Sequence, residues 1–439
     1  MSFDPRSIPV DPAATAALAR HGLEYRLLDP DDHHAMTAWV DAKHRGFHHG
    51  RPRDAELSHD ITVAAERRVH GVYDPKAADP AVPVATVDGW PTGLSVPGGR
   101  SVDAWAVSAV TVAATHRRRG IARALMEGEL ANARSAGAAI AMLTVTEATI
   151  YGRYGYAPAA RAATVTVDRQ RAHWIGPDAP GRLQFVERAE LRETAAAVTR
   201  RAVARTPGEI DRWPGIIDRA LGLVDPDGDS ARRVRTVRYD DEHGNPQGFV
   251  AYHITREPNV PGLVDMDFLV AATDDAERAL WRFVVEQDFV SGVRGRLRSV
   301  DEPLPWLLED PRAVTLTDVV DHLWLRVLDP VEALTARRYG MAGTLDLEVA
   351  DPLHHASGRF RLTADDRGRA EVERLDDADV ASARHGLKLG VQELGAVYLG
   401  GVRPSVLARA GRITSNAATL ALADRMFAAD RTPHLSIWF

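Results

Sequence analysis

A basic turn between two patterned segments is the part of this sequence best suited to bind an anion. The segment from Ala106 to Val112 is rich in small and β-branched residues and predicts a strand, and a helical pattern begins at Ile121. The turn between them contains Arg117, Arg118 and then Gly120. The free N–H groups and the positive dipole end of a helix start attract phosphate, and glycine allows a close approach. The spacing therefore favours a pyrophosphate site, with a charged loop that only caps the helix as the alternative.

Two aromatic segments could also carry chemistry. Tyr151 follows a predicted buried strand at Ala139–Val145 and lies in a short predicted helix around Glu147–Arg153. A tyrosine in such a Tyr-Gly loop is ordinarily a packing residue. The segment from His434 to Phe439 is apolar and ends in two aromatic residues, so we expect it to dock into the body of the protein.

Breaker residues divide the chain into three segments, with expected limits 1–170, 178–327 and 330–439. In the first segment, strand, glycine turn, helix and strand form an α/β crossover unit. The second repeats this order faintly, with a strand at Val264–Val270 and a helix at Ala276–Asp288. Its intervening turn has two aspartates and neither glycine nor arginine, which would repel phosphate.

The third segment is expected to form a mixed α/β domain. Strands are predicted at 343–349, 358–363 and 370–375, and helices at 331–339, near 387–393 and at 404–410.

Composition limits the classes of function. The chain has 54 Lys and Arg against 61 Asp and Glu, which gives a net charge of −7 and argues against nucleic acid as a partner. It contains no cysteine, so thiolate chemistry and disulfides are excluded. We expect no signal peptide, no transmembrane helix and a cytoplasmic location.

The remaining candidate residues are expected to be structural. His44 and His48 have a helical spacing, but no carboxylate set completes a metal site, so no metal is expected. Trp39, Trp90 and Trp105 are expected in the core, with Trp39 and Trp105 as weak candidates for the wall of a cleft.

The basic turn resembles a known signature. The run from Arg117 to Ala122 is similar to the Gln/Arg-x-x-Gly-x-Gly/Ala motif of the GNAT superfamily of acetyltransferases. The run Ile150-Tyr151-Gly152-Arg153-Tyr154-Gly155-Tyr156 further resembles the Eis (enhanced intracellular survival) family of aminoglycoside acetyltransferases. That resemblance implies an α/β (α+β) fold of tandem GNAT domains, the second degenerate, followed by a domain similar to sterol carrier proteins.

The resemblance also implies roles for particular residues. Val110 and Val112 would hold the pantetheine arm of acetyl-CoA. The pyrophosphate would be held by four residues of the turn, namely Arg117, Arg118, Gly120 and Ala122. Tyr151 would be the general acid that protonates the departing thiolate, and the terminal carboxylate of Phe439 would be the general base for the attacking amine, directly or through a water. Ala114 stands where the family often has proline.

The implied acceptor is a small-molecule amine, such as an aminoglycoside or another polyamine. Family members assemble as hexamers, so a homo-hexamer is expected. Two alternatives stay open: acetyl transfer to lysines of proteins or peptides, and a non-catalytic protein that binds acyl-CoA and regulates. A lipid-carrier role for the last domain is a third and weaker alternative.

Overall fold

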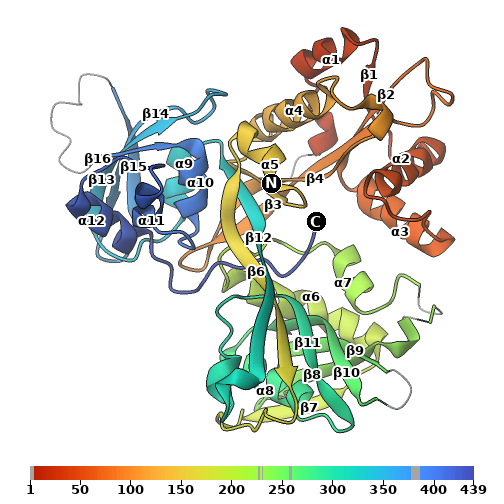
Figure 1. The fold of residues 1–439 in the computed structure, drawn as a ribbon, viewed down its shortest axis with the longest axis vertical. Coiled ribbons are helices and arrows are strands. Elements are labelled where there is room, and N and C mark those ends of the chain that lie inside the picture. The colour runs from red at the N-terminus through yellow and green to blue at the C-terminus, as the bar shows by residue number, and fades with distance from the viewer. Residues whose placement is uncertain (1–3, 226–227, 230, 257–259, 377–385) are drawn as a thin grey trace.

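In this computed structural model the described residues are 4–225, 228–229, 231–256, 260–376 and 386–439. The chain forms three lobes that meet near the carboxyl end of the chain (Figure 1). Two of the lobes share one sheet of 12 strands, and the third has a sheet of 4 strands.

The first lobe contains the basic turn and covers its strands with helices. Its strands are β1 (Glu24–Leu27), β2 (Arg68–Tyr73), β3 (Ala85–Val96), β4 (Arg100–Val112) and β5 (Ile140–Thr144). Its helices are α1 (Pro12–Ala19), α2 (His33–Gly46), α3 (Asp54–Ala65), α4 (Ile121–Ser135) and α5 (Ala148–Tyr151). Helix α4 packs against β3, β4 and β5, which holds the start of this helix beside the end of β4.

The second lobe continues the same sheet. Its strands are β6 (Ala157–Asp168), β7 (Gly181–Phe185), β8 (Arg235–Asp241), β9 (Pro246–Thr255), β10 (Gly262–Ala271), β11 (Val290–Arg298) and β12 (Val314–Val327). Its helices are α6 (Arg188–Ala204), α7 (Pro214–Ala220) and α8 (Asp274–Val285).

Strand pairing links the two lobes across the predicted boundary near residue 170. The strand order is β1-β2-β3-β4-β5-β12-β6-β11-β10-β9-β8-β7, so β12 lies between β5 and β6. Strand β12 pairs antiparallel with all of β5, from Leu323 opposite Thr144 to Val327 opposite Ile140. The long ribbon of β6 and β12 is visible in the centre of Figure 1. The two lobes are therefore joined by continuous backbone hydrogen bonding.

The third lobe is a separate small sheet with helices. Its strands are β13 (Gly343–Ala350), β14 (Gly358–Ala364), β15 (Ala370–Leu375) and β16 (Gly386–Gly390). Its helices are α9 (Pro330–Ala336), α10 (Val391–Tyr398), α11 (Pro404–Arg409) and α12 (Ala417–Phe427). Helix α10 packs on β6 and β12, which docks this lobe against the shared sheet.

Most local predictions are confirmed, and one is wrong. The predicted helix near 387–393 begins only at Val391, and the preceding residues form strand β16. Leu387 and Leu389 are buried while Lys388 between them is exposed, which is the alternation of a strand. Glu393 accepts a hydrogen bond from the backbone N of Gly390 at 2.9 Å, and this contact caps the new helix.

The last ten residues leave the third lobe, cross the second and end at the first. The backbone N of His434 donates to the carbonyl of Pro207 at 2.8 Å, and Thr432 Oγ1 donates to Asp301 Oδ2 at 2.9 Å. Leu435 and Ile437 are buried. The expected docking of this segment is therefore confirmed.

A buried ion pair ties the shared sheet to the third lobe. Arg326 Nη2 donates to Asp351 Oδ2 at 2.7 Å, and both side chains are fully buried. Burial opposes the ionisation of Asp351, but Arg326 and backbone N–H groups hold its pKa below the usual value. The carboxylate therefore depends on these donors.

We predict that Arg326→Ala lowers the free energy of unfolding by about 3–5 kcal/mol, because it leaves Asp351 buried without its counter-charge. Urea unfolding followed by circular dichroism measures the change. The control is Arg123→Ala, since Arg123 forms an exposed pair with Glu127 on α4 and should cost less than about 1 kcal/mol. Equal losses in the two variants would contradict the assignment.

Candidate active site

Strands β4 and β5 pair over a short stretch and then separate. Residues Ala104–Ala106 pair in parallel with Ile140–Met142. Beyond this point β4 continues to Val112 with a bulge at Ala109, whose φ is +52°, while β5 stays paired with β12. Val110 and Val112 are two residues apart, so their backbone groups face the same edge. This edge can hold an extended chain that carries amide groups.

The basic turn stands at the open end of this separation. Gly120 has φ +74° and precedes α4, where no side chain caps the helix start. A Cβ atom added at Gly120 would meet no atom within 4 Å, so the space beside it is open. Arg118 also has a positive φ, of +64°. The left-handed turn points free backbone N–H groups away from the protein, as a pyrophosphate site requires.

The arginines of the turn are exposed and differ in their partners. Arg119 Nη1 lies 3.9 Å from Asp74 Oδ2, and that carboxylate also pairs with His116. Arg117 and Arg118 form no ion pair with any of the described residues. Their guanidinium groups are therefore available to an anion at the start of α4.

Tyr151 ends the short helix α5 and is buried, with 7% of its surface exposed. Burial, together with nearby Glu147 and Tyr154, raises the pKa of Tyr151 above its usual value. The phenol is therefore protonated at neutral pH and can donate a proton. The following loop packs closely, because a Cβ atom at Gly155 would lie 2.7 Å from Arg326 Nε.

The carboxylate of Phe439 lies at the end of β5. Thr144 Oγ1 donates to Phe439 O at 2.7 Å, which joins residues 295 positions apart. The ring of Phe439 makes an edge contact with Trp90 at 5.5 Å between centroids. The last residue is thus held beside the strand that separates from β4, and Tyr151 follows the same strand.

His322 on β12 forms a hydrogen bond with the segment just before Phe439. Its Nε2 donates to the carbonyl of Ile437 at 2.7 Å, and its ring contacts Trp438 at 4.4 Å. Burial lowers the pKa of His322 to about 4. The imidazole is therefore neutral at physiological pH, with the proton on Nε2.

An aromatic cavity of about 230 Å³ lies next to this region. The Arg67 guanidinium carbon lies 3.7 Å from the ring centroid of Trp90 and 4.9 Å from that of Trp213. Arg67 also pairs with buried Asp88 at 3.3 Å. The rings come from β3 and from the segment before α7, so the cavity lies between the first and second lobes. Its other lining residues are Pro5, Val63, Glu66 and Pro91.

The expectation that Trp39, Trp90 and Trp105 lie in the core is confirmed. Trp39 and Trp105 are fully buried. The indole N–H of Trp39 donates to the carbonyl of His70, and that of Trp105 donates to the carboxylate of Glu129. Trp90 and Trp213, with Thr144, were missed as residues near Phe439. No local motif marks these residues, because Trp90 and Thr144 contact Phe439, and Trp213 contacts Trp90, across long stretches of sequence.

The second lobe has the same arrangement of strands and helix without a phosphate site. Strands β10 and β11 pair in parallel only through Gly262–Met266, and α8 follows β10. Thr273 caps α8, and the first turn of the helix carries Asp274, Asp275 and Glu277. This capped and acidic helix start cannot accommodate a pyrophosphate.

Two further findings concern metal and membrane. Within the described ranges, no group of three or more His, Asp or Glu side chains is arranged to hold a metal ion. His44 instead contacts Asp60 at 2.9 Å. Among the helices formed by described residues, none has the length and apolar character needed to cross a membrane.

Family comparisons match three parts of the chain. An acetyltransferase (GNAT) domain matches residues 24–159, a second acetyltransferase (GNAT) domain matches 208–327, and a sterol carrier protein domain matches 330–436. Each range falls inside one of the predicted segments, although the domain limits themselves stay predictions.

Relatives and solved structures agree with these matches. An uncharacterized N-acetyltransferase of Streptomyces avermitilis is 33% identical over 389 residues, covering 86% of this chain and 90% of the relative. The N-acetyltransferase Eis of Mycobacterium tuberculosis is 34% identical over 350 residues, covering 77% of this chain and 81% of Eis. The crystal structure of Eis1 from Mycobacterium abscessus superposes with a TM-score of 0.79 at 27% identity, covering 95% of this chain and 100% of Eis1.

The fold and these matches define a GNAT acetyltransferase that uses acetyl-CoA. Within that class the chain belongs to the Eis family of N-acetyltransferases. The tandem GNAT fold with a sterol-carrier-like third domain is thereby confirmed.

The buried imidazole of His322 predicts a pH-dependent stability. The unfolded chain takes up a proton at this residue below about pH 6.5, whereas the folded chain resists protonation until about pH 4. The free energy of unfolding should therefore fall as pH drops through this window, by about 3 kcal/mol from His322 alone. The free energy of unfolding is measured in urea at pH 7 and pH 4 for the unmodified protein and for His322→Gln. The glutamine keeps an N–H donor and does not titrate. The same pH slope in both proteins would contradict the prediction.

Proposed function

We propose that this enzyme transfers the acetyl group of acetyl-CoA to amines of aminoglycosides or similar polyamines by direct attack. Tyr151 acts as general acid and the terminal carboxylate of Phe439 acts as general base. The observation that carries the proposal is the hydrogen bond of Thr144 to that carboxylate, because it fixes an anionic group at the end of β5, next to the separation of β4 from β5.

We propose that acetyl-CoA binds along the open edge of β4. Backbone groups of Val110 and Val112 pair with the pantetheine arm. The pyrophosphate lies on the start of α4, near Gly120 and Ala122, where Arg117 and Arg118 supply charge. Bound acetyl-CoA supplies the activated acyl group.

The proposed proton transfers follow from the two ionisation states. The carboxylate of Phe439 accepts a proton from the ammonium group of the acceptor, directly or through a water, and the resulting neutral amine attacks the thioester carbonyl. The phenol of Tyr151 has a pKa raised by burial, so it keeps its proton until a thiolate departs nearby. As negative charge develops on the sulfur, the phenol donates a hydrogen bond to it and then its proton, and the phenolate is reprotonated by the proton that the acylated nitrogen loses.

The aromatic cavity next to Phe439 supports an amine acceptor. The guanidinium of Arg67 lies 3.7 Å from the ring centroid of Trp90 and 4.9 Å from that of Trp213, and the two rings meet edge to face, so their surface attracts cations. The relative Eis is an N-acetyltransferase, which agrees with an amine as acceptor.

We further propose that the protein is a cytoplasmic homo-hexamer. The distal part of β12 exposes Leu316, Val319 and Val320, and Trp306 is 85% exposed. Exposed apolar side chains of this kind mark contact surfaces between proteins. Light scattering coupled to size exclusion measures the oligomeric mass.

The experiment that tests the proposed reaction is CoA release from acetyl-CoA, followed with a thiol reagent, against aminoglycosides, simple polyamines and lysine peptides. Release with aminoglycosides or polyamines supports the proposal. Release with peptides alone moves the acceptor to proteins, and no release from protein that binds acetyl-CoA favours a non-catalytic role.

Replacing both Arg117 and Arg118 with alanine should raise the KM for acetyl-CoA by roughly 10-fold or more, because charge-assisted bonds to pyrophosphate are lost. The value of kcat should change little. Arg134→Ala on the far end of α4 is the matched control. An unchanged KM in the double variant would remove these residues from the cofactor site.

Tyr151→Phe should lower kcat by roughly 100-fold while acetyl-CoA still binds, because only the proton donor is removed. Tyr154→Phe is the control, since Tyr154 lies in the same loop and is also buried. Steady-state kinetics with binding of acetyl-CoA measured separately gives both quantities. Full turnover by Tyr151→Phe would rule out the proposed acid.

One glycine added after Phe439 should lower kcat by roughly 100-fold, because it moves the carboxylate away from Thr144. The control is Phe439→Leu, which keeps the carboxylate in place and changes only the ring. The rate of CoA release distinguishes them. Full activity of the extended chain would show that the carboxylate has no role.

A further inference from the structure

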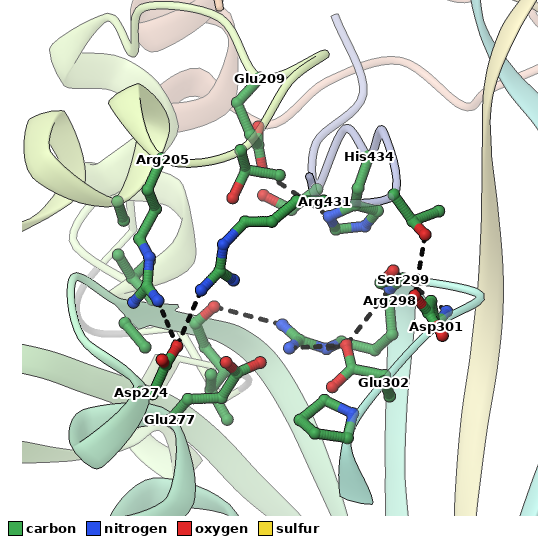
Figure 2. Close-up of a pocket in the computed structure, with 18 of the residues that line it drawn as sticks. Arg205, Glu209, Asp274, Glu277, Arg298, Ser299, Asp301, Glu302, Arg431 and His434 are labelled. Carbon is green, nitrogen blue, oxygen red and sulfur yellow. Dashed lines mark hydrogen bonds and ion pairs between the residues drawn. The ribbon is translucent and has the colours of Figure 1, made fainter. Parts of the chain in front are cut away.

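A cavity of about 410 Å³ lies in the second lobe at the carboxyl end of β10. Its walls are the end of α6, the start of α8, the segment after β11 and the carboxyl-terminal tail (Figure 2). This position is a crevice outside the end of a parallel strand pair, where ligands of α/β folds commonly bind. Its volume is within the range of small-molecule sites.

The cavity occupies the place in the second lobe that the opening between β4 and β5 has in the first. Here, however, a side chain bridges the separated strands. Arg298 at the end of β11 donates to the carbonyl of Leu269 on β10 at 3.3 Å and pairs with Glu302 at 2.8 Å. Glu302 also accepts from Trp281 at 3.1 Å. This bridge closes the slot that a pantetheine arm would need and leaves the cavity beside it.

Two arginines converge on one carboxylate at one side of the cavity. Arg205 and Arg431 both donate to the same oxygen of Asp274, and Figure 2 shows their guanidinium groups converging on it. Two cations therefore share one carboxylate. Neither guanidinium has another hydrogen bond to a described residue, so donors remain for a second anion.

The carboxyl group of Glu277 also lines the cavity, near Arg205 and Arg431. Glu277 on α8 forms no ion pair or hydrogen bond with the described residues. Burial, reinforced by Glu302, raises the pKa of Glu277 against the opposing effect of nearby Arg298, Arg205 and Arg431. A carboxyl group in this state gains most from a bound cation, because the cation would both pair with it and favour its ionised form.

Two further groups in the wall are buried and unsatisfied. Thr199 Oγ1 and Arg212 Nε have no hydrogen-bond partner within the described structure. Thr199 is 2% exposed, and the Arg212 side chain is 4% exposed. Both atoms have almost no accessible surface, so they lie behind the cavity wall and add no donor to the cavity itself.

We propose that this cavity binds a small zwitterion of the free amino acid class. Its carboxylate binds Arg205 and Arg431, and its ammonium group binds Glu277. A simple anion would bind the arginines but leave Glu277 without a cation. A polycation would bind Glu277 but be repelled by Arg205 and Arg431. A coenzyme is excluded by the Arg298 bridge and by the acidic start of α8.

The tail connects this site to the catalytic region. Arg431, Thr432, His434 and Ser436 line the cavity, and the chain ends three residues later at Phe439. A ligand on Arg431 should therefore slow amide hydrogen exchange in residues 430–439. This expectation does not depend on the acetyl-transfer reaction.

The test is titration calorimetry of the full-length protein, without acetyl-CoA, against each free amino acid up to about 10 mM. We expect saturable binding of at least one. The matched probes are its N-acetyl derivative, which lacks the ammonium group, and the corresponding decarboxylated amine. Each should bind at least about 10-fold more weakly, because a charged hydrogen bond is lost.

Variants localise the binding. Glu277→Gln and Arg431→Ala should each weaken it by about 10-fold or more, whereas Glu193→Gln, an exposed glutamate on α6, should not. Absence of saturable binding by every amino acid would overturn the proposal. So would binding unchanged in Glu277→Gln, which would place the ligand in the aromatic cavity, or equal binding of the N-acetyl derivative or the amine. These results do not bear on CoA release, so the two proposals can fail separately.

Discussion

The pairing of β12 with β5 is the constraint on which the active-site region depends. Strand β5 is hydrogen-bonded to β12 along its whole length. Beyond Met142 it therefore stays in the sheet without pairing with β4. That independence lets β4 bend away at Ala109 and leaves a free edge inside an otherwise continuous sheet. The strand that makes this possible belongs to the second lobe. The first GNAT unit is therefore completed by residues about 180 positions further along the chain.

Strand β12 also positions the end of the chain. His322 holds the carbonyl of Ile437, and Thr144 opposite Leu323 holds the carboxylate of Phe439. A terminal carboxylate on a free tail would be solvated and mobile. Here the burial of Leu435 and Ile437 fixes the carboxylate in place. His322 helps through its hydrogen bond to Ile437, and because it is neutral it adds no competing charge. One antiparallel strand pair thus controls both the opening for the cofactor and the place of the proposed base.

The features that sequence reasoning found are local, and those it missed are long-range. The turn at Arg117–Gly120, the helix after it and the acidic start of α8 follow from residue types at fixed spacing, and the structure agrees. The insertion of β12 between β5 and β6 left no local pattern, because the strands it joins are far apart in sequence. The pattern predicts a helix near 387–393, but strand β16 occupies Gly386–Gly390, because a short apolar run has no decisive period. From the sequence, Trp90 and Trp213 have the residue type of core positions. Only the long-range contact of Trp90 with Phe439 shows that they lie near the chain end. The proposed roles of Tyr151 and Phe439 rested on family resemblance, and the geometry adds that Tyr151 follows β5 and that Thr144, the last residue of β5, binds the chain end.

The proposed placement of the base can be tested without lengthening the chain. Semi-synthesis of the protein with Phe439 as its carboxamide keeps every side chain, the tail length and the hydrogen bond from Thr144, and removes only the negative charge. The rate of CoA release from acetyl-CoA with a good acceptor, across pH 6 to 9, is the measurement. If the carboxylate accepts the proton, kcat of the amide falls by roughly 100-fold near neutral pH, and the loss shrinks as rising pH deprotonates the amine. An amide protein with the same rate and pH profile as the carboxylate protein would contradict the role assigned to the chain end.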